Sequence, residues 1–253
     1  MSFCADCFKG VRHQGTPTGK IEQIGGVNCY VATPSTDYPK HKALIYLYDA
    51  FGLALENNLL LCDDFASNGL LTIAPDYFEG EPIPIDAFNA QGLRPDFDMT
   101  AWRSKHGPEQ CHPFVIKVIN ALKEQGVNDF AAVGYCYGAR FVFDLAFENI
   151  TKVSAVAHPS LLKVPDDLEK YASDSKAPLL INGAAVDSQF PPESQAKADE
   201  ILGDGKFAPG YRREYFDGCT HGFAVRGDMS DPKVKAGKEG AFKATVEWFW
   251  KHL

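Results

Sequence analysis

Short apolar runs rich in β-branched and aromatic residues alternate along the chain with longer stretches that have helical spacing. The hexad Ala43–Tyr48 is apolar without interruption, which is typical of a strand covered on both faces in a parallel sheet. Four further predicted strands follow it: Leu70–Ala74, Phe130–Val133, Val153–Ala157 and Leu179–Asn182. Five stretches have the spacing of helices: Glu56–Asn68, Pro113–Gln125, Tyr137–Glu148, Glu193–Leu202 and Gly237–Trp250. This alternation predicts one α/β domain over residues 1–253, with a mostly parallel, doubly wound sheet and helices on both faces.

One segment interrupts the alternation. Residues 78–107 follow the strand that ends at Ala74 and are rich in Pro, Gly and acidic residues. A loop of this length inside a compact domain is usually functional, so we expect the excursion to form a lid or a wall of the binding pocket.

Composition narrows the function classes. The chain has 253 residues, of which 45% are hydrophobic and 23% charged, which excludes a disordered chain or a small disulfide scaffold. The net charge of −8 argues against a nucleic-acid partner, because binding a polyanion needs a basic face. No apolar run reaches the ~18–20 residues that cross a bilayer, and the first residues lack the features of a secretory signal. We therefore expect a cytoplasmic protein with no membrane partner.

The seven cysteines are an odd number and are spread along the whole chain, which favours free thiols in a reducing compartment. A cysteine with a role is then expected to be a nucleophile or a ligand. Cys4-x-x-Cys7 with His13 resembles part of a metal site but has no second pair of ligands, so we predict no metal and no cofactor.

The pentapeptide Gly134-Tyr135-Cys136-Tyr137-Gly138 lies directly after a predicted strand and before a predicted helix. It has the form of the G-x-nucleophile-x-G elbow, with Cys136 in place of the usual serine. The glycines are needed because a side chain beside this strained turn would collide with the strand or the helix. A helix N-terminus also favours the thiolate. The alternative is a buried cysteine in a glycine-rich turn.

An elbow of this kind requires an acid after a later strand and a histidine after the next one. Asp187 follows the strand Leu179–Asn182, and His221 follows the strand-like run Tyr211–Phe216. The order predicts a triad of Cys136, His221 and Asp187. Asp217 lies on the histidine loop and is a second candidate for orienting His221.

These residues are accompanied by motifs along almost the entire chain, and together they resemble dienelactone hydrolase (carboxymethylenebutenolidase), in particular its fungal cytosolic branch. The matching segments are His13–Gly19, Gly25–Ala32, Tyr48–Gly52, Ala74–Phe78, the elbow, Ala157–Ser160 and His221–Gly227. The resemblance implies the α/β-hydrolase fold. It also implies a carboxylic ester hydrolase whose substrate is a small lactone or ester, with or without a carboxylate.

The resemblance implies further roles. Asp49, at the carboxyl end of the first core strand, is expected to contact the nucleophile in the resting enzyme and to gate it, although bacterial members carry Glu there and Asp49 could instead cap a turn. Arg226 is expected to bind a substrate carboxylate. A second such arginine has no clear match, and Arg94 and Arg103 are both candidates.

The fold places an oxyanion hole at two backbone N–H groups, those of Tyr137 and Ala50. His158 ends a strand at the same edge of the sheet and is expected either to line the pocket or to cap the strand. The apolar walls are expected from Tyr137 and four other aromatic residues: Phe51, Phe78, Trp102 and Phe223.

The sequence thus predicts a cysteine-dependent hydrolase that opens lactones or cleaves enol and aryl esters through a thioester, with dienelactone-like substrates favoured. The alternative is a protein of the same fold that binds a small molecule or senses oxidants through Cys136 without hydrolysis. We expect a monomer or a weak homodimer.

Overall fold

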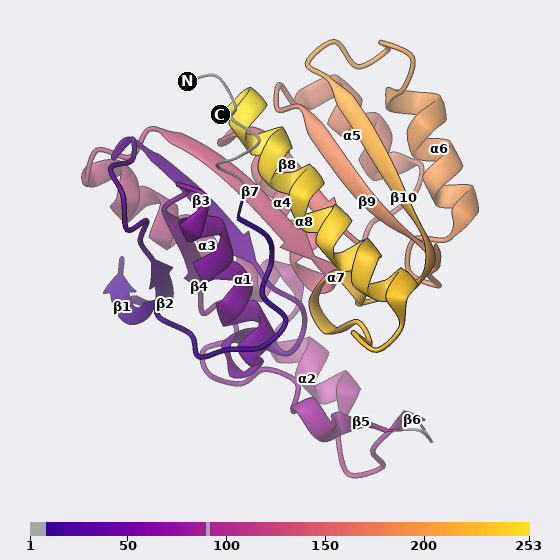
Figure 1. Ribbon diagram of the computed structural model, residues 1–253, viewed down its shortest axis with the longest axis horizontal. Coiled ribbons are helices and arrows are strands. Elements are labelled where there is room, and N and C mark those ends of the chain that lie inside the picture. The colour runs from indigo at the N-terminus through magenta and orange to yellow at the C-terminus, as the bar shows by residue number, and fades with distance from the viewer. Residues whose placement is uncertain (1–8, 90–91) are drawn as a thin grey trace.

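The computed structural model describes residues 9–89 and 92–253 (Figure 1). Its main sheet has eight strands in the order β1-β2-β4-β3-β7-β8-β9-β10. Their bounds are β1 Lys20–Ile24, β2 Val27–Ala32, β3 Lys42–Leu47, β4 Thr72–Pro75, β7 Asp129–Tyr135, β8 Thr151–Ala157, β9 Leu179–Val186 and β10 Tyr211–Thr220. The pairs β1/β2 and β2/β4 are antiparallel and all other pairs are parallel. The predicted mostly parallel α/β sheet is confirmed.

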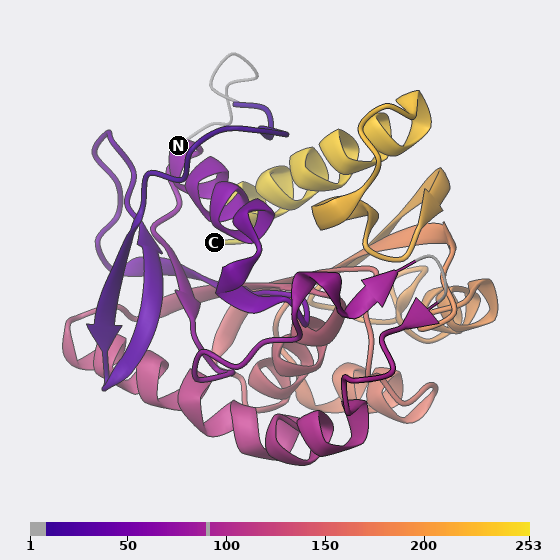
Figure 2. The same ribbon diagram turned by 90° about the horizontal axis from the view of Figure 1, so that it is seen from below.

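Helices cover both faces of this sheet (Figure 2). Helices α1 (Glu56–Ser67) and α8 (Pro232–His252) lie on one face. The short α7 (Phe223–Arg226) precedes α8 in the chain and packs against both helices. On the other face lie α3 (Pro108–Glu124), α4 (Ala139–Phe147) and α5 (Asp166–Asp174), with α6 (Pro192–Leu202) beside α5. The central strands are therefore buried on both sides, which explains their continuous apolar sequences.

Two predicted helices begin five residues earlier in the structure than their sequence pattern indicated. Helix α3 begins at Pro108 and α8 at Pro232, so each has proline in its first turn, where the missing N–H has no partner to lose. Asp231 caps α8 by accepting hydrogen bonds from the first backbone amides. Pro113 lies inside α3 rather than at its start.

The excursion 78–107 contains the short strands β5 (Phe88–Asn89) and β6 (Gly92–Leu93), followed by α2 (Met99–Lys105). The two strands lie at the periphery of the molecule, beyond α2 (Figure 1). Trp102 of α2 connects the end of the excursion to its beginning, because its indole N–H donates to the carbonyl of Glu81 at 2.8 Å. In the parts of the chain that are described, we find no helix with the length and apolar character needed to span a membrane.

Candidate active site

The nucleophile elbow is a sharp turn at the carboxyl end of β7. Cys136 has a φ of +49°, a conformation that is costly for a residue with a side chain. A Cβ at Gly134 would lie 2.7 Å from the carbonyl oxygen of Gly138, and a Cβ at Gly138 would overlap the carbonyl oxygen of Leu47. Both positions therefore require glycine, for the steric reason expected from the sequence. The sulfur of Cys136 is partly exposed at this edge.

The carboxyl ends of β9 and β10 bring the two expected partners together. Asp187 directly follows β9 and is almost fully buried, and His221 directly follows β10. Nδ1 of His221 lies 2.9 Å from each carboxylate oxygen of Asp187. Asp217, the second candidate, instead forms a surface ion pair with Lys233 at 2.7 Å. The geometry therefore favours Asp187 as the partner of His221.

The ionisation of His221 depends on both neighbours. Burial lowers its pKa, but hydrogen bonds to Asp187 and to Cys136 outweigh that effect and raise the pKa to about 9. At neutral pH the ring is therefore protonated.

Ser160 is a residue of this site that the sequence reasoning did not single out. Its hydroxyl oxygen lies 3.4 Å from the sulfur of Cys136, and its backbone N–H donates to the carbonyl of Cys136 at 3.0 Å. The side chain is only 5% exposed. Ser160 lies just beyond the carboxyl end of β8, at the same edge as the elbow, and this position in the sequence could have marked it as a candidate site residue.

His158 is fully buried between the elbow and the histidine loop. Its ring centroid lies 5.1 Å from that of His221 and 5.6 Å from that of Phe223, both in edge-to-face contact. Neither ring nitrogen has a hydrogen-bond partner. Burial, followed by the charges of His221 and Arg226, lowers its pKa well below the usual value, so this ring is neutral. The structure places it behind the catalytic histidine candidate.

Asp49 and Arg226, which are 177 residues apart, form an ion pair in the structure. Oδ2 of Asp49 accepts from Nε of Arg226 at 3.0 Å, and Oδ1 accepts from the backbone N–H of Phe51 and the amide of Asn58, each at 3.1 Å. The guanidinium also lies over the ring of Phe51, 4.5 Å from its centroid. Asp49 is fully buried, whereas a third of the Arg226 side chain is exposed.

The two backbone amides expected for an oxyanion hole lie on adjoining segments. Tyr137 is in the short helix Cys136–Gly138, whose first backbone N–H groups have no partner within the helix. Ala50 is on the loop after β3, and the elbow packs directly against the end of this strand at Leu47.

The expected aromatic residues occupy different surroundings. Phe78 and Trp102 pack edge-on against each other and against the ring of Tyr137, whose hydroxyl donates to the carbonyl of His106. Phe223, in contrast, packs against His158. This cluster joins the excursion to the elbow.

The remaining candidates lie away from the elbow or outside the described ranges. Arg94 pairs with Asp86 and Asp96 within the excursion, and Arg103 is exposed on α2. Cys4 and Cys7 lie outside the described residues. Within residues 9–89 and 92–253, no group of three or more potential ligands is arranged to hold a metal ion.

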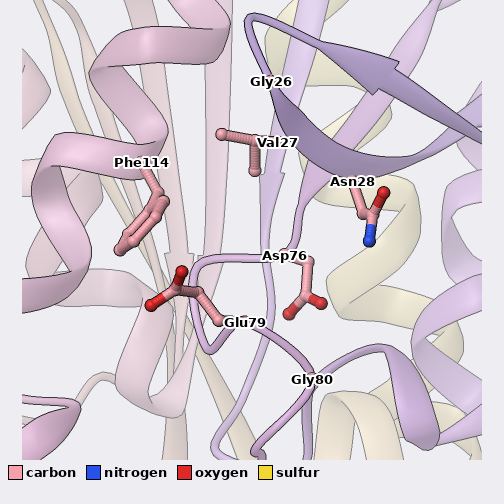
Figure 3. Close-up of a pocket in the computed structure, with 7 residues that line it drawn as sticks. All are labelled: Gly26, Val27, Asn28, Asp76, Glu79, Gly80 and Phe114. Atoms are coloured by element: carbon pink, nitrogen blue, oxygen red, sulfur yellow. The ribbon is translucent and has the colours of Figure 1, made fainter.

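A separate hollow of about 260 Å³ lies beside the start of β2 and the segment that follows β4. Figure 3 shows Phe114 of α3 on one side of it and Asn28 and Asp76 on the other. None of the three triad candidates lines this hollow, so we place the active site at the elbow.

The fold and the elbow together define an α/β hydrolase. A model of the dienelactone hydrolase family matches residues 27–253, and the chain belongs to this family. It is 35% identical to "Hydrolase pyvD" of Aspergillus violaceofuscus, over 98% of this chain and 96% of that protein. It is also 35% identical to "Dienlactone hydrolase 1" of Gibberella moniliformis, over 96% and 92% of the two chains.

A solved structure of a Klebsiella pneumoniae protein described as a dienelactone hydrolase has the same fold. The TM-score is 0.69 at 19% identity, with 89% of this chain and 93% of that chain covered. The resemblance inferred from the motifs is therefore confirmed, and the protein is a carboxylic ester hydrolase of the dienelactone hydrolase type acting on a small-molecule ester or lactone.

Proposed function

We propose that the enzyme uses Cys136 as a nucleophile to open enol lactones and cleave enol or aryl esters, with dienelactone-like substrates favoured. One observation carries this proposal: a strained elbow carries Cys136 at the edge of the sheet where His221 is held by a buried carboxylate. This is the arrangement that nucleophilic catalysis needs, with a nucleophile, a base and a group that orients the base.

The reaction proceeds in two halves. The thiolate of Cys136 adds to the carbonyl carbon, and the oxyanion is stabilised by the amides of Ala50 and Tyr137. The bond to the leaving oxygen then breaks, and His221 supplies its proton to that oxygen. In the second half His221 removes a proton from water, which adds to the thioester and expels the thiolate. With a lactone, the leaving oxygen stays on the product, which departs as a ring-opened acid.

Arg226 gives the site a means of recognising a carboxylate on the substrate. Its Nε is held by Asp49 and its plane lies over Phe51, so its terminal amino groups remain for a bidentate interaction. The carboxylate of Asp49 accepts hydrogen bonds from Arg226, Phe51 and Asn58, and its expected resting contact with Cys136 is not found among the described residues. Its role in this proposal is to orient the guanidinium of Arg226. Of the residues expected to form the apolar wall, Phe51 and Trp102 keep some exposed surface, whereas His158, Phe78 and Phe223 are buried almost completely and support the site from behind.

Sulfur as the nucleophile restricts the substrates. A thiolate is also a good leaving group, so an adduct with a poor leaving group returns to substrate by expelling the sulfur. Enol and aryl esters avoid this outcome, whereas simple alkyl esters do not. The rate on an enol lactone should therefore greatly exceed that on a matched alkyl ester, and equal rates would contradict the argument.

The Cys136→Ala variant tests the nucleophile. It should remain folded and lose at least ~10³-fold in activity, by analogy with other triad knockouts. Cys219→Ala, which removes a buried thiol outside the site, is the matched control and should keep its activity. Wild-type enzyme mixed with p-nitrophenyl acetate should give a burst of p-nitrophenol and an acetyl adduct on Cys136. A protein that only binds a small molecule or senses oxidants would show no continued release of p-nitrophenol after any burst, and normal hydrolysis by Cys136→Ala would refute the assignment.

A further inference from the structure

The backbone around Ser160 is held in an unusual conformation. Of the six non-glycine residues with positive φ in the described ranges, three surround this site: Cys136 at +49°, His158 at +39° and Leu161 at +63°. Each such residue costs on the order of 1–3 kcal/mol and persists only where the surroundings impose it. Strain of this kind is concentrated at functional sites. The turn that carries Ser160 is thus distorted on both sides of the hydroxyl.

The distorted turn is also fixed to the elbow. The N–H of Ser160 donates to the carbonyl of Cys136, and the N–H of His158 donates to the carbonyl of Asn182 in β9, each at 3.0 Å. These two bonds set the hydroxyl of Ser160 at 3.4 Å from the sulfur. Because the residue is only 5% exposed, its hydroxyl requires a partner, and the sulfur of Cys136 is the one it contacts.

We propose that Ser160 is a further catalytic residue, which donates a hydrogen bond to the sulfur of Cys136 whenever that sulfur carries negative charge. A hydroxyl can donate to a thiolate, and hydrogen bonds to charged groups are stronger than those between neutral groups. A thioester sulfur carries no such charge and is a poor acceptor. The bond therefore stabilises the resting thiolate and is weakened in the acyl-enzyme.

The same bond then assists the second half of the reaction. Water adds to the thioester carbonyl and gives one proton to His221. The carbon–sulfur bond breaks, its electron pair stays on sulfur, and the acid product leaves. Ser160 donates to the sulfur as this charge develops, so it stabilises the departing thiolate. This inference rests on the proposed function, and it adds a group that acts mainly on breakdown of the acyl-enzyme.

The test compares Ser160→Ala with Ser160→Thr, which keeps a hydroxyl, and with Ser154→Ala as the control. Ser154 is fully buried and lies within β8, the strand that precedes Ser160, and its hydroxyl contacts Thr151 rather than Cys136. The first measurement is the rate of iodoacetamide labelling of the Cys136 peptide against pH. In Ser160→Ala the midpoint of labelling against pH should rise by about one pH unit. At any pH below the midpoint, the variant then has about tenfold less thiolate than the wild type. Ser160→Thr should restore the midpoint.

The second measurement is the time course with p-nitrophenyl acetate at a pH where the thiolate is fully formed in each variant. Deacylation should slow about tenfold in Ser160→Ala while acylation is as fast or faster, because the thiolate has lost a stabilising bond, so the acetyl-enzyme accumulates. An unchanged midpoint and an unchanged ratio of the two rates in Ser160→Ala would overturn the proposal, as would the same changes in Ser154→Ala. If Cys136→Ala is inactive while Ser160→Ala behaves as wild type, only the role of Ser160 fails. If Cys136→Ala is active, the proposed nucleophile fails.

Discussion

The ion pair between Asp49 and Arg226 makes a prediction that a double-mutant cycle can measure. Two unit charges about 4 Å apart attract by about 4 kcal/mol at an effective dielectric constant of 20. A third of the Arg226 side chain is exposed, so solvent screening reduces the expected coupling to about 2–3 kcal/mol. The two residues should therefore be strongly coupled in the free energy of unfolding.

The cycle compares Asp49→Asn, Arg226→Met and the double variant by urea unfolding. Arg226→Met should be the more destabilising single change, because it leaves a fully buried carboxylate without its cation. Asp49→Asn keeps the shape of the side chain and leaves an arginine that water can partly solvate. The double variant should then lose about 2–3 kcal/mol less free energy of unfolding than the two single variants lose together. If the effect of the double variant equals the sum of the two single effects within about 0.5 kcal/mol, the two residues are not coupled and the reasoning is refuted.

Three further predictions concern pH and packing. The pKa of His221, raised to about 9, predicts that kcat/KM on an enol lactone falls as the pH rises through about 9, where the imidazolium is lost; a profile that stays flat to pH 10 would contradict this. Burial lowers the pKa of Lys238 to about 8, so between pH 8 and 10.5 the unfolded chain binds more protons there and stability rises with pH. Lys238→Met should remove up to about 3 kcal/mol of that rise in urea unfolding, and an identical rise in the variant would show that other groups cause it. Gly138→Ala places a Cβ on the Leu47 carbonyl oxygen and should destabilise the fold by about 3 kcal/mol or more and abolish activity, whereas Gly10→Ala, in open space, should change neither.

The sequence predicted the central sheet because its strands are buried on both faces. Such strands are continuous apolar runs and need no periodicity to be recognised. The antiparallel pair β1 and β2 at one edge was not predicted. Four of the five residues of β1 are exposed, so it has almost no apolar signal. Helix α5 was also missed, since it is short and begins with three acidic residues in its first turn.

The positions of Cys136, Asp187 and His221 could be predicted because each follows a strand in an order that the fold fixes. The contacts of Ser160 with Cys136 and of Arg226 with Asp49 could not. These contacts join segments that are far apart in the chain, and no spacing in the sequence records which way a side chain points across a sheet edge. A rule that examines every polar residue just beyond a strand would have included Ser160. The same rule would also have included His158 and would not have preferred Ser160.

The strand order has a consequence for how the site assembles. From β7 onward, β8, β9 and β10 add to the sheet one after another, in the same order as they occur in the chain. During synthesis the thiol would therefore emerge long before the imidazole that activates it, and the carboxylate would arrive between them. A nascent or truncated polypeptide would carry an unactivated cysteine, which limits premature reactions with other thiols or electrophiles until the last strand has paired.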